Sequence, residues 1–299
     1  MKSRARRLVR FLKGPLGHAV LAPNLRFRVQ HWRVETPLWG DRPSLRIAVL
    51  SDLHWGYRPV TTAMVAAVKR RVAALAPDLV VFLGDLAEGR GLEAKARHVE
   101  AGAAALAGLG APLGCYAVLG NHDWHDDAAV QRDRVGVPVA ATHLERAGYR
   151  VLQNTALRPG REDIWLAGLA SQQAFKEPKG KVRRTGADDL TATLAAAPGD
   201  DPIVLLAHEP DIFPALPDPR VVLTLSGHMH AGQIRLFGRA LYAPSRYGTR
   251  FDYGHFEEAG RHLIVSGGLG CSTIPLRIGI VPEITCIECC GPGRAGSVA

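Results

Sequence analysis

The sequence contains little cysteine and no long apolar run. Five cysteines among 299 residues are few and odd in number, which argues against a disulfide framework and favours a reducing compartment. No apolar stretch approaches the ~20 residues that a membrane-spanning helix requires. An apolar fraction of 47% is instead typical of a soluble globular protein, long enough to bury one large α/β core.

Three of the five cysteines lie close together near the C-terminus. The pattern Cys286-x-x-Cys289-Cys290 could form a soft-metal site, but no second cysteine or histidine pair lies nearby in the sequence. A structural or incidental role is therefore favoured. Cys115 falls within a predicted buried strand and is expected to be a small core residue.

Most of the chain also lacks net charge. Residues 1–46 contain 11 Lys/Arg and two Asp/Glu, whereas the remaining residues contain 26 of each, so the net charge of +9 belongs to the N-terminal segment. The rest of the chain offers no basic stripe for a nucleic-acid backbone, and no nucleic-acid partner is expected.

The N-terminal segment combines positive charge with apolar side chains. Six basic residues within residues 2–13 surround Leu8, Val9, Phe11 and Leu12. This pattern is typical of a short amphipathic helix lying on an anionic membrane surface. A solvated tail is the alternative; an export signal fits less well, because prolines interrupt the segment that would form its apolar core.

These observations predict a simple organisation. Residues 1–44 form a basic N-terminal segment with an irregular or extended lead-in, residues 45–290 form one domain, and residues 291–299 form a flexible tail. The expected location is the cytoplasm, either free or peripheral on the inner face of the cell membrane.

Apolar strands and amphipathic helices alternate in the first half of the domain. Strands are predicted at residues 45–50, 78–83 and 116–119, with helices at residues 62–76 and 92–108 between them. A polar group follows each strand, at the edge where open α/β sheets bind their ligands.

The second half predicts a second sheet. Residues 125–160 predict mixed helix and a hairpin around Tyr149 to Leu157, and residues 176–184 predict an exposed basic loop. Further strands are predicted at residues 164–169, 203–207, 221–225, 233–236, 263–266 and 284–287.

Seven side chains follow these strands and carry only oxygen or nitrogen ligand atoms: Asp52, His54, Asp85, Asn121, His208, His228 and His230. In extended backbone, residues two apart point to one face. Asp52 with His54, and His228 with His230, could therefore each bind one ion. The set suits two divalent ions (Mn, Fe, Zn or Co) that share one carboxylate. Such a pair, ~3.5–4 Å apart, lowers the pKa of a bridging water and clamps the oxygens of an in-line displacement.

Two further residues complete the predicted chemistry. His122, next to Asn121, could stabilise phosphoryl oxygens or protonate the leaving oxygen, and Asp123 could orient it and raise its pKa. His122 and Asp123 are therefore the candidate catalytic residues, acting on a small phosphorylated substrate.

The motifs together resemble the calcineurin-like metallophosphoesterase superfamily over roughly residues 45–287. The shared motifs are D-x-H at Asp52, GD at Gly84, GNH-D at Gly120, an isolated histidine at His208 and GH-x-H at Gly227. The resemblance implies a four-layer αββα sandwich of two mixed β-sheets flanked by helices. It also implies one ion on Asp52, His54, Asp85 and His230, and a second on Asp85, Asn121, His208 and His228.

A narrower resemblance is to bacterial membrane-associated phosphodiesterases, including UDP-2,3-diacylglucosamine pyrophosphatases. It rests on the segments around the metal motifs, on residues 245–248 and 265–272, and on Pro275-Leu276-Arg277. It implies hydrolysis of a phosphodiester or pyrophosphate bond by a metal-bridging hydroxide, in a nucleotide-sugar or lipid-linked substrate such as UDP-2,3-diacylglucosamine. The basic loop at residues 176–184 looks longer than in that subgroup, and a clear membrane anchor is lacking.

Three residues after the last histidine motif are candidate substrate contacts: Arg246, Tyr247 and Arg250. Arginine binds phosphate oxygens in pairs, although a purely structural role for all three is an equal alternative. Two other functions remain open for the whole chain. One is a nuclease or cyclic-nucleotide phosphodiesterase on the same centre, and the other is a non-catalytic scaffold, which the complete ligand set disfavours.

Overall fold

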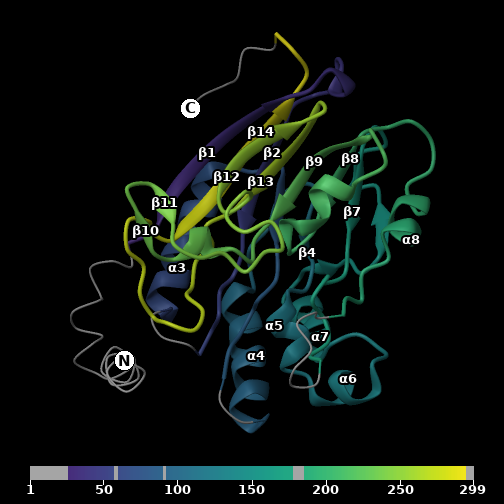
Figure 1. The fold of residues 1–299 in the computed structure, drawn as a ribbon. Helices are drawn as coiled ribbons and strands as arrows, with labels where there is room; N and C mark the ends of the chain where they lie inside the picture. The colour runs from purple at the N-terminus through teal and green to yellow at the C-terminus, as the bar shows by residue number, and fades with distance from the viewer. Residues whose placement is uncertain (1–25, 57–59, 90–91, 178–184, 294–299) are drawn as a thin grey trace.

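The computed structural model describes residues 26–56, 60–89, 92–177 and 185–293 (Figure 1). The predicted amphipathic helix at residues 2–13 and most of the basic loop at residues 176–184 lie outside the described residues. No helix in the described ranges has the length and apolar composition to span a bilayer.

The first sheet has six strands in the order β1-β14-β2-β3-β4-β5. Their bounds are β1 Arg28–Glu35, β2 Leu45–Leu50, β3 Leu79–Phe82, β4 Cys115–Ala117, β5 Arg150–Val151 and β14 Glu283–Cys290. β2 to β5 run parallel, whereas β14 is antiparallel to β2 and parallel to the edge strand β1.

The second sheet also has six strands, in the order β12-β13-β9-β8-β7-β6. Their bounds are β6 Thr155–Leu157, β7 Trp165–Gly168, β8 Ile203–Leu206, β9 Val221–Ser226, β12 Gly254–Glu258 and β13 Arg261–Val265. The four central strands are parallel and the two edge strands are antiparallel to them. A separate hairpin joins β10 Arg235–Leu236 to β11 Arg239–Ala240.

The helices are short apart from α3 and α4. Their bounds are α3 Thr62–Leu75, α4 Leu92–Leu106, α5 Asn121–His125, α6 Ala128–Asp133, α7 Val139–Arg146 and α8 Leu190–Ala195, with 3-10 turns η2 Pro37–Trp39, η3 Pro210–Ala215 and η4 His230–Gly232. The Thr61 side chain caps α3 by accepting from the amide of Met64, and Ala76 ends it in a left-handed conformation.

Alternating side chains divide the core into layers. In β2, Ala48 and Leu50 face the layer of α3, α4 and α7, whereas Ile47 and Val49 face the second sheet. The outer face of the second sheet is covered by α8, η3 and irregular segments that include Phe251. The predicted four-layer α/β arrangement of two mixed sheets is confirmed, with an outer layer on the second sheet that is only partly helical (Figure 1).

Three sequence-based expectations differ from the structure. Residues 28–35, placed in the N-terminal segment, form β1, because their backbone pairs along its whole length with β14. The predicted hairpin around Tyr149 to Leu157 does not form: β5 pairs with β4 in the first sheet and β6 with β7 in the second. Asn154, with φ of 52°, turns the chain between the two sheets. The last strand, β14, likewise belongs to the first sheet rather than the second.

The C-terminal cysteines lie on β14. None of the five cysteines of the chain forms a disulfide, and all five are buried. Cys289 packs between the two sheets, whereas Cys286, three positions earlier on the strand, faces the opposite side. The three cannot converge on one ion from a regular strand, and the metal-capable clusters among the described residues contain no cysteine.

Candidate metal centre

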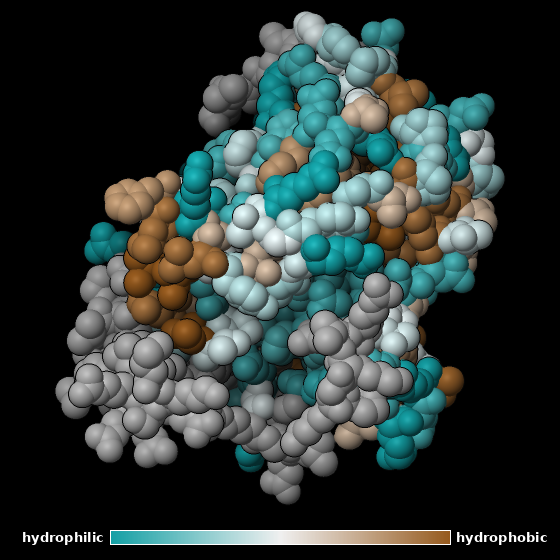
Figure 2. Space-filling model, viewed as in Figure 1, coloured by the Kyte–Doolittle hydropathy of each residue, from teal (hydrophilic) through white to brown (hydrophobic). Residues whose placement is uncertain are grey.

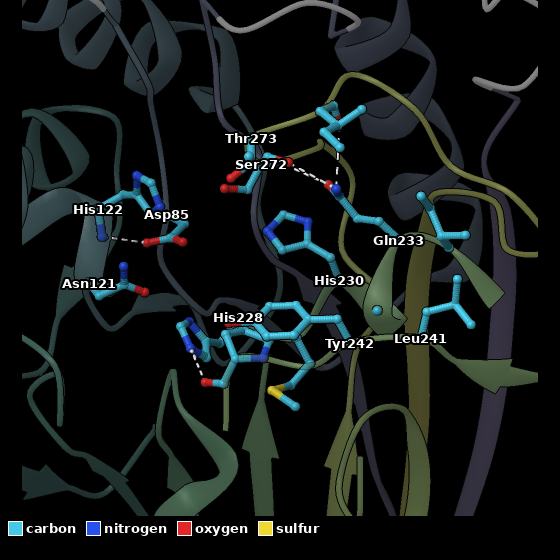
Figure 3. A pocket seen from close by; sticks show the side chains of 15 residues that line it. Asp85, Asn121, His122, His228, His230, Gln233, Leu241, Tyr242, Ser272 and Thr273 are labelled. Carbon is cyan, nitrogen blue, oxygen red and sulfur yellow. Dashed lines mark hydrogen bonds between the residues drawn. The ribbon is translucent and has the colours of Figure 1, made fainter. Parts of the chain in front are cut away.

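The site lies where the carboxyl ends of parallel strands from both sheets meet. β2, β3 and β4 lead into the loops that carry Asp52, Asp85 and Asn121, while β8 and β9 lead into His208 and His228. Figure 3 shows Asp85, Asn121 and His122 on one side of a cavity, with His228 and His230 facing them. The two sheets therefore contribute to one site, as the strand order predicts.

The backbone is strained at most of the predicted ligand positions. Five of the seven residues have positive φ, between 47° and 66°: Asp52, His54, Asp85, His228 and His230. The expectation of extended backbone at the two residue pairs is wrong, because each loop turns sharply as it leaves its strand. Such angles cost side-chain-bearing residues roughly 1–2 kcal/mol each and persist where the surroundings hold them.

Two glycines let the loops approach one another. A Cβ on Gly120 would collide with the Asp85 side chain and with Cε1 of His208, and a Cβ on Gly227 would collide with Ser51 and Asp52. The loops after β2 and β3 are also in direct contact, because the amide of Asp52 donates to the carbonyl of Gly84 at 2.9 Å. The glycines of the GNH and GH-x-H motifs thus permit close contact between loops.

One group of ligand atoms converges from four residues. Asp52, His54, Asp85 and His230 each offer an atom within 4.8 Å of the others, and all four are buried. The Nε2 atoms of His54 and His230 lie 3.1 Å apart. Oδ2 of Asp85 lies 3.5 Å from Nε2 of His54, and Oδ1 of Asp52 lies 3.5 Å from Nε2 of His230.

A second group shares Asp85 with the first. Asp85, His208 and His228 also offer atoms within 4.8 Å of one another. Nε2 of His208 lies 3.4 Å from the same Oδ2 of Asp85. Asn121 borders the cavity beside this group and is 2% exposed. The structure therefore brings all seven predicted ligands to one place.

Several polar atoms here have no hydrogen-bond partner in the described part of the chain. One of them is the buried Oδ1 of Asn121. A buried polar atom without a partner costs roughly 1–3 kcal/mol, and metal coordination would satisfy this oxygen. Buried carboxylate, amide and imidazole groups that converge in this way fit a divalent metal centre.

Asp85 and His208 reinforce each other's charge. Burial alone would raise the pKa of Asp85, but His208 and His122 hold it well below its usual range. Burial alone would lower the pKa of His208, but Asp85 raises it well above the usual range. Burial lowers the pKa of His228 to about 3, with the charge of His208 adding to the effect. His228 is therefore neutral, as metal binding requires, while His208 must release a proton.

His122 and Asp123 occupy different positions from each other. The His122 imidazole borders the cavity, its amide donates to Oδ1 of Asp85 at 2.8 Å, and burial lowers its pKa. The Asp123 carboxylate instead accepts from the amides of Asp85, Leu86 and Gly120 at 2.8–2.9 Å. Its oxygens thus join the loop after β3 to the loop after β4. The expectation was that this carboxylate orients His122, but its hydrogen bonds go to these backbone amides instead.

The structure brings none of the three candidate substrate contacts to the cavity. Arg246 pairs with Asp211, and Arg250 pairs with Glu258. The Tyr247 ring packs against Phe251, with centroids 5.9 Å apart. Proximity in sequence to the last histidine motif misleads here, because these side chains turn back onto the second sheet.

Sequence reasoning missed several neighbours of the ligands. Oε2 of Glu88 lies 3.4 Å from Nδ1 of His54, and Nε2 of Gln173 lies 3.3 Å from Nε2 of His228. The buried guanidinium of Arg277 donates to the carbonyl oxygens of Gly270 and His230. Glu88 follows Asp85 by three residues on the same loop, and this spacing could have identified it from the sequence. No motif near Gln173 indicates its position beside His228.

The cavity has a volume of about 380 Å³ and two unlike halves. The ligand residues line one half. Apolar side chains line most of the other, among them Ile234, Leu241, Tyr242 and Ile274. Figure 3 shows Leu241 and Tyr242 on the side away from Asp85 and Asn121, with Gln233 and Ser272 above them. The cavity can therefore receive a molecule with both a charged and an apolar part.

Comparisons with known proteins agree with this geometry. The profile of the calcineurin-like phosphoesterase family matches residues 45–232. An uncharacterized metallophosphoesterase of Aquifex aeolicus is 30% identical, with 89% of this chain and 93% of that protein covered. A Bos taurus transmembrane protein with a metallophosphoesterase domain is 32% identical over 84% of this chain and 55% of its own length.

A third relative has a named activity. The UDP-2,3-diacylglucosamine pyrophosphatase LpxG of Chlamydia trachomatis is 29% identical, with 64% of this chain and 65% of that protein covered. With the Asp/His cluster, these findings make the chain a metal-dependent phosphoesterase, a hydrolase. The chain belongs to the calcineurin-like phosphoesterase family.

Proposed function

We propose that the site binds two divalent ions and hydrolyses a phosphodiester or pyrophosphate bond. The first ion would lie among Asp52, His54, Asp85 and His230, and the second among Asp85, Asn121, His208 and His228. The observation that carries this proposal is the membership of Asp85 in both groups of converging ligand atoms. Mn, Fe, Zn and Co suit this mixture of imidazole, carboxylate and amide.

Divalent ions bound here would supply Lewis acidity and an activated water molecule. The chain's own residues supply positioning and proton transfer. Because burial lowers the pKa of His122, its imidazole is neutral at pH 7 and can donate an N–H to a phosphoryl or leaving oxygen in the cavity. Asp123 acts as a positioning residue, since its carboxylate joins the loops that carry Asp85 and Gly120.

The proposed substrate is small, phosphorylated and partly apolar. A nucleotide-sugar or lipid-linked compound such as UDP-2,3-diacylglucosamine fits a cavity with a ligand-lined half and an apolar half. The name of the Chlamydia trachomatis relative supports this class. A nuclease function is less well supported, because the net positive charge is confined to residues 1–46 and the rest of the chain has no net charge.

The proposed organisation follows from the same observations. Residues 45–290 would carry the reaction, and the basic segment at residues 2–13 would bring the protein to the anionic inner face of the cell membrane. Most of the tail expected at residues 291–299 lies outside the described residues. The alternative is a cytoplasmic protein that does not bind the membrane, which requires that this segment have no affinity for anionic lipid.

The proposal is tested by turnover of bis-p-nitrophenyl phosphate beside p-nitrophenyl phosphate, after chelation and re-loading with Mn, Zn, Co, Fe or Mg. We expect metal-dependent turnover that favours the diester, and loss of both turnover and bound metal in Asp85→Asn. A preference for the monoester would instead indicate a phosphatase. Near-wild-type turnover by Asp85→Asn would contradict the two-ion assignment, and bound metal without any turnover would indicate a scaffold or a narrow substrate range.

A further inference from the structure

Large apolar side chains are exposed beside the mouth of the cavity. Five of them form what we call the apolar rim, with exposures of 46%, 104%, 64%, 71% and 42%: Leu236, Phe237, Leu241, Tyr242 and Ile278. Figure 2 shows this rim as a brown patch over the β10–β11 hairpin. Exposed apolar side chains that gather in this way mark a surface with an external partner.

Phe237 contributes nothing to the fold that would explain its presence. It occupies the two-residue turn of the hairpin together with Gly238, and the two φ angles are 52° and 78°. A turn with two positive φ angles favours Asn, Asp or Gly at its first position, and phenylalanine there is unfavourable. Its side chain is also fully exposed. Phenylalanine is thus unfavourable both for the turn conformation and for exposure to water, which indicates that its side chain contacts an external partner.

The rim is continuous with the cavity. Leu241 and Tyr242 belong to the rim and also line the cavity opposite the ligand residues (Figure 3). Ile278 is held beside the hairpin, because its amide donates to the carbonyl of Gln233 and its carbonyl accepts from the amide of Arg235. Whatever covers the rim therefore also faces the mouth of the cavity.

The chain enters its first strand at this same edge. The amide of Arg28, the first residue of β1, donates to the carbonyl of Pro282, four residues after Ile278. Residues 1–25 precede this point and carry the basic segment at residues 2–13. The segment is thus joined to the fold near the rim.

One exposed arginine of the hairpin is left without an acidic partner. Of the five arginines in residues 233–251 and 270–282, Arg277 is buried, and the other three besides Arg239 pair with Asp252, Asp211 and Glu258. Arg239, exposed on β11, forms no ion pair with any other described residue. Arginine and tyrosine around exposed aliphatic and phenyl groups are typical of surfaces that enter the headgroup region of an anionic bilayer.

A second copy of the chain fits this surface poorly. A two-fold contact centred on the hairpin would bring Arg239 of one copy toward Arg239 of the other, two charges of the same sign.

We propose that the apolar rim is a docking surface for an anionic lipid bilayer. Phe237 and Leu236 enter the bilayer interface, Arg239 lies at the headgroups, and the mouth of the cavity faces the lipid. The cavity would then receive a phosphorylated headgroup directly from the bilayer while the lipid chains remain near the rim. This inference concerns where the site works and is separable from the reaction proposed above.

The test labels the rim directly in the full-length protein. Because all five native cysteines are buried, a Phe237→Cys variant can be labelled at one site with an environment-sensitive fluorophore. On vesicles of phosphatidylcholine with phosphatidylglycerol, we expect a blue shift and brighter emission. A labelled Val135→Cys variant, exposed in the loop after α6, is the matched control and should not respond.

Substitutions measure the contribution of the phenyl group. Phe237→Asn suits the turn and should leave the melting temperature unchanged or raise it, while lowering the vesicle partition coefficient by roughly tenfold. Phe237→Leu should restore most of the binding, and Val135→Asn should bind like the wild type.

Two results would overturn the proposal. One is binding to anionic vesicles without any response of the label at position 237, which would place the contact elsewhere. The other is a concentration-dependent response without vesicles, which would identify a second copy as the occupant. If the label responds but no phosphoester is hydrolysed, the docking surface stands and the proposed reaction fails.

Discussion

His122 borders the cavity without belonging to either group of atoms that shares Asp85. It is grouped instead with His54 and Glu88, on the outer side of the first group. Replacing it with alanine should leave the metal in place and lower kcat by roughly 10²–10⁴, the scale of lost acid/base assistance. Metal content and kcat are measured on the same preparation, with His143→Ala on α7 as the control. An enzyme that loses metal yet keeps its rate when re-saturated would identify His122 as a ligand.

Glu88 is expected to position His54 through the second ring nitrogen. Its carboxylate lies beside Nδ1 of His54, while Nε2 faces the other ligands. Carboxylates in this position orient ligand histidines and increase their basicity, and their loss typically costs 10–100-fold in metal affinity. Glu88→Gln should therefore weaken metal binding by about that factor in a calorimetric titration. Unchanged affinity would mean that the contact has no effect on the centre.

The same pair gives a pH-dependent effect in the metal-free protein. Burial would raise the pKa of Glu88, but His54 lowers it below 4.5, and burial would lower the pKa of His54, but Glu88 raises it above 6.5. The carboxylate therefore stabilises the fold above about pH 4.5 and loses this effect on acidification. The imidazolium stabilises it below about pH 6.5 and loses this effect as the pH rises through its folded pKa. The Tm difference between wild type and Glu88→Gln should thus be largest between these values.

Motif residues were predictable one by one, but their surroundings were not. Asp52, Asp85 and His208 each follow an apolar strand, and such strands place their ends at one edge of a sheet. The contacts of Asp123 with backbone amides, and of Arg246 with Asp211, depend on which loops meet in space. No spacing in the sequence carries that information.

At the scale of elements, the site depends on two loops that approach each other from different sheets. Gly120 follows β4 of the first sheet and touches His208, which follows β8 of the second. Gly120→Ala should lower stability by roughly 1–3 kcal/mol, as overpacking does, and should also weaken metal binding, because Asp85 must move. Gly110→Ala is the control, since a Cβ there meets open space. Equal melting temperatures and metal contents in both variants would contradict this account.

Periodicity predicted the helices and central strands closely but gave no information on pairing between distant segments. α3 and β2 have clear apolar patterns, and their observed bounds agree with those expected. The segment that forms β1 was expected to be an irregular or extended lead-in outside the domain, because nothing local shows that it pairs with β14, some 250 residues later. β5 and β6 are two and three residues long, too short for any pattern to show that they belong to different sheets.

At the scale of the whole molecule, the chain combines a basic segment with an exposed apolar rim. The body is neutral overall, the basic segment precedes β1 in the sequence, and the rim lies at the mouth of the cavity. Stable attachment to a bilayer generally needs two weak signals together. A protein with both can orient its site toward lipid, whereas either signal alone leaves binding marginal.

Removing residues 2–13 separates the two signals. Each basic residue near an anionic surface contributes ~1 kcal/mol, so loss of six should weaken binding to phosphatidylglycerol vesicles at low salt by at least about a hundredfold. Turnover of a soluble diester should not change, because residues 45–232 carry the family match and the ligands lie between Asp52 and His230. Deletion of residues 294–299, which contain one arginine, is the control in the same sedimentation assay.

Because added salt screens the basic segment but not the rim, the residual binding of the shortened protein should be less salt-sensitive than that of the full chain. Unchanged binding after the deletion would show that residues 2–13 do not contact the membrane.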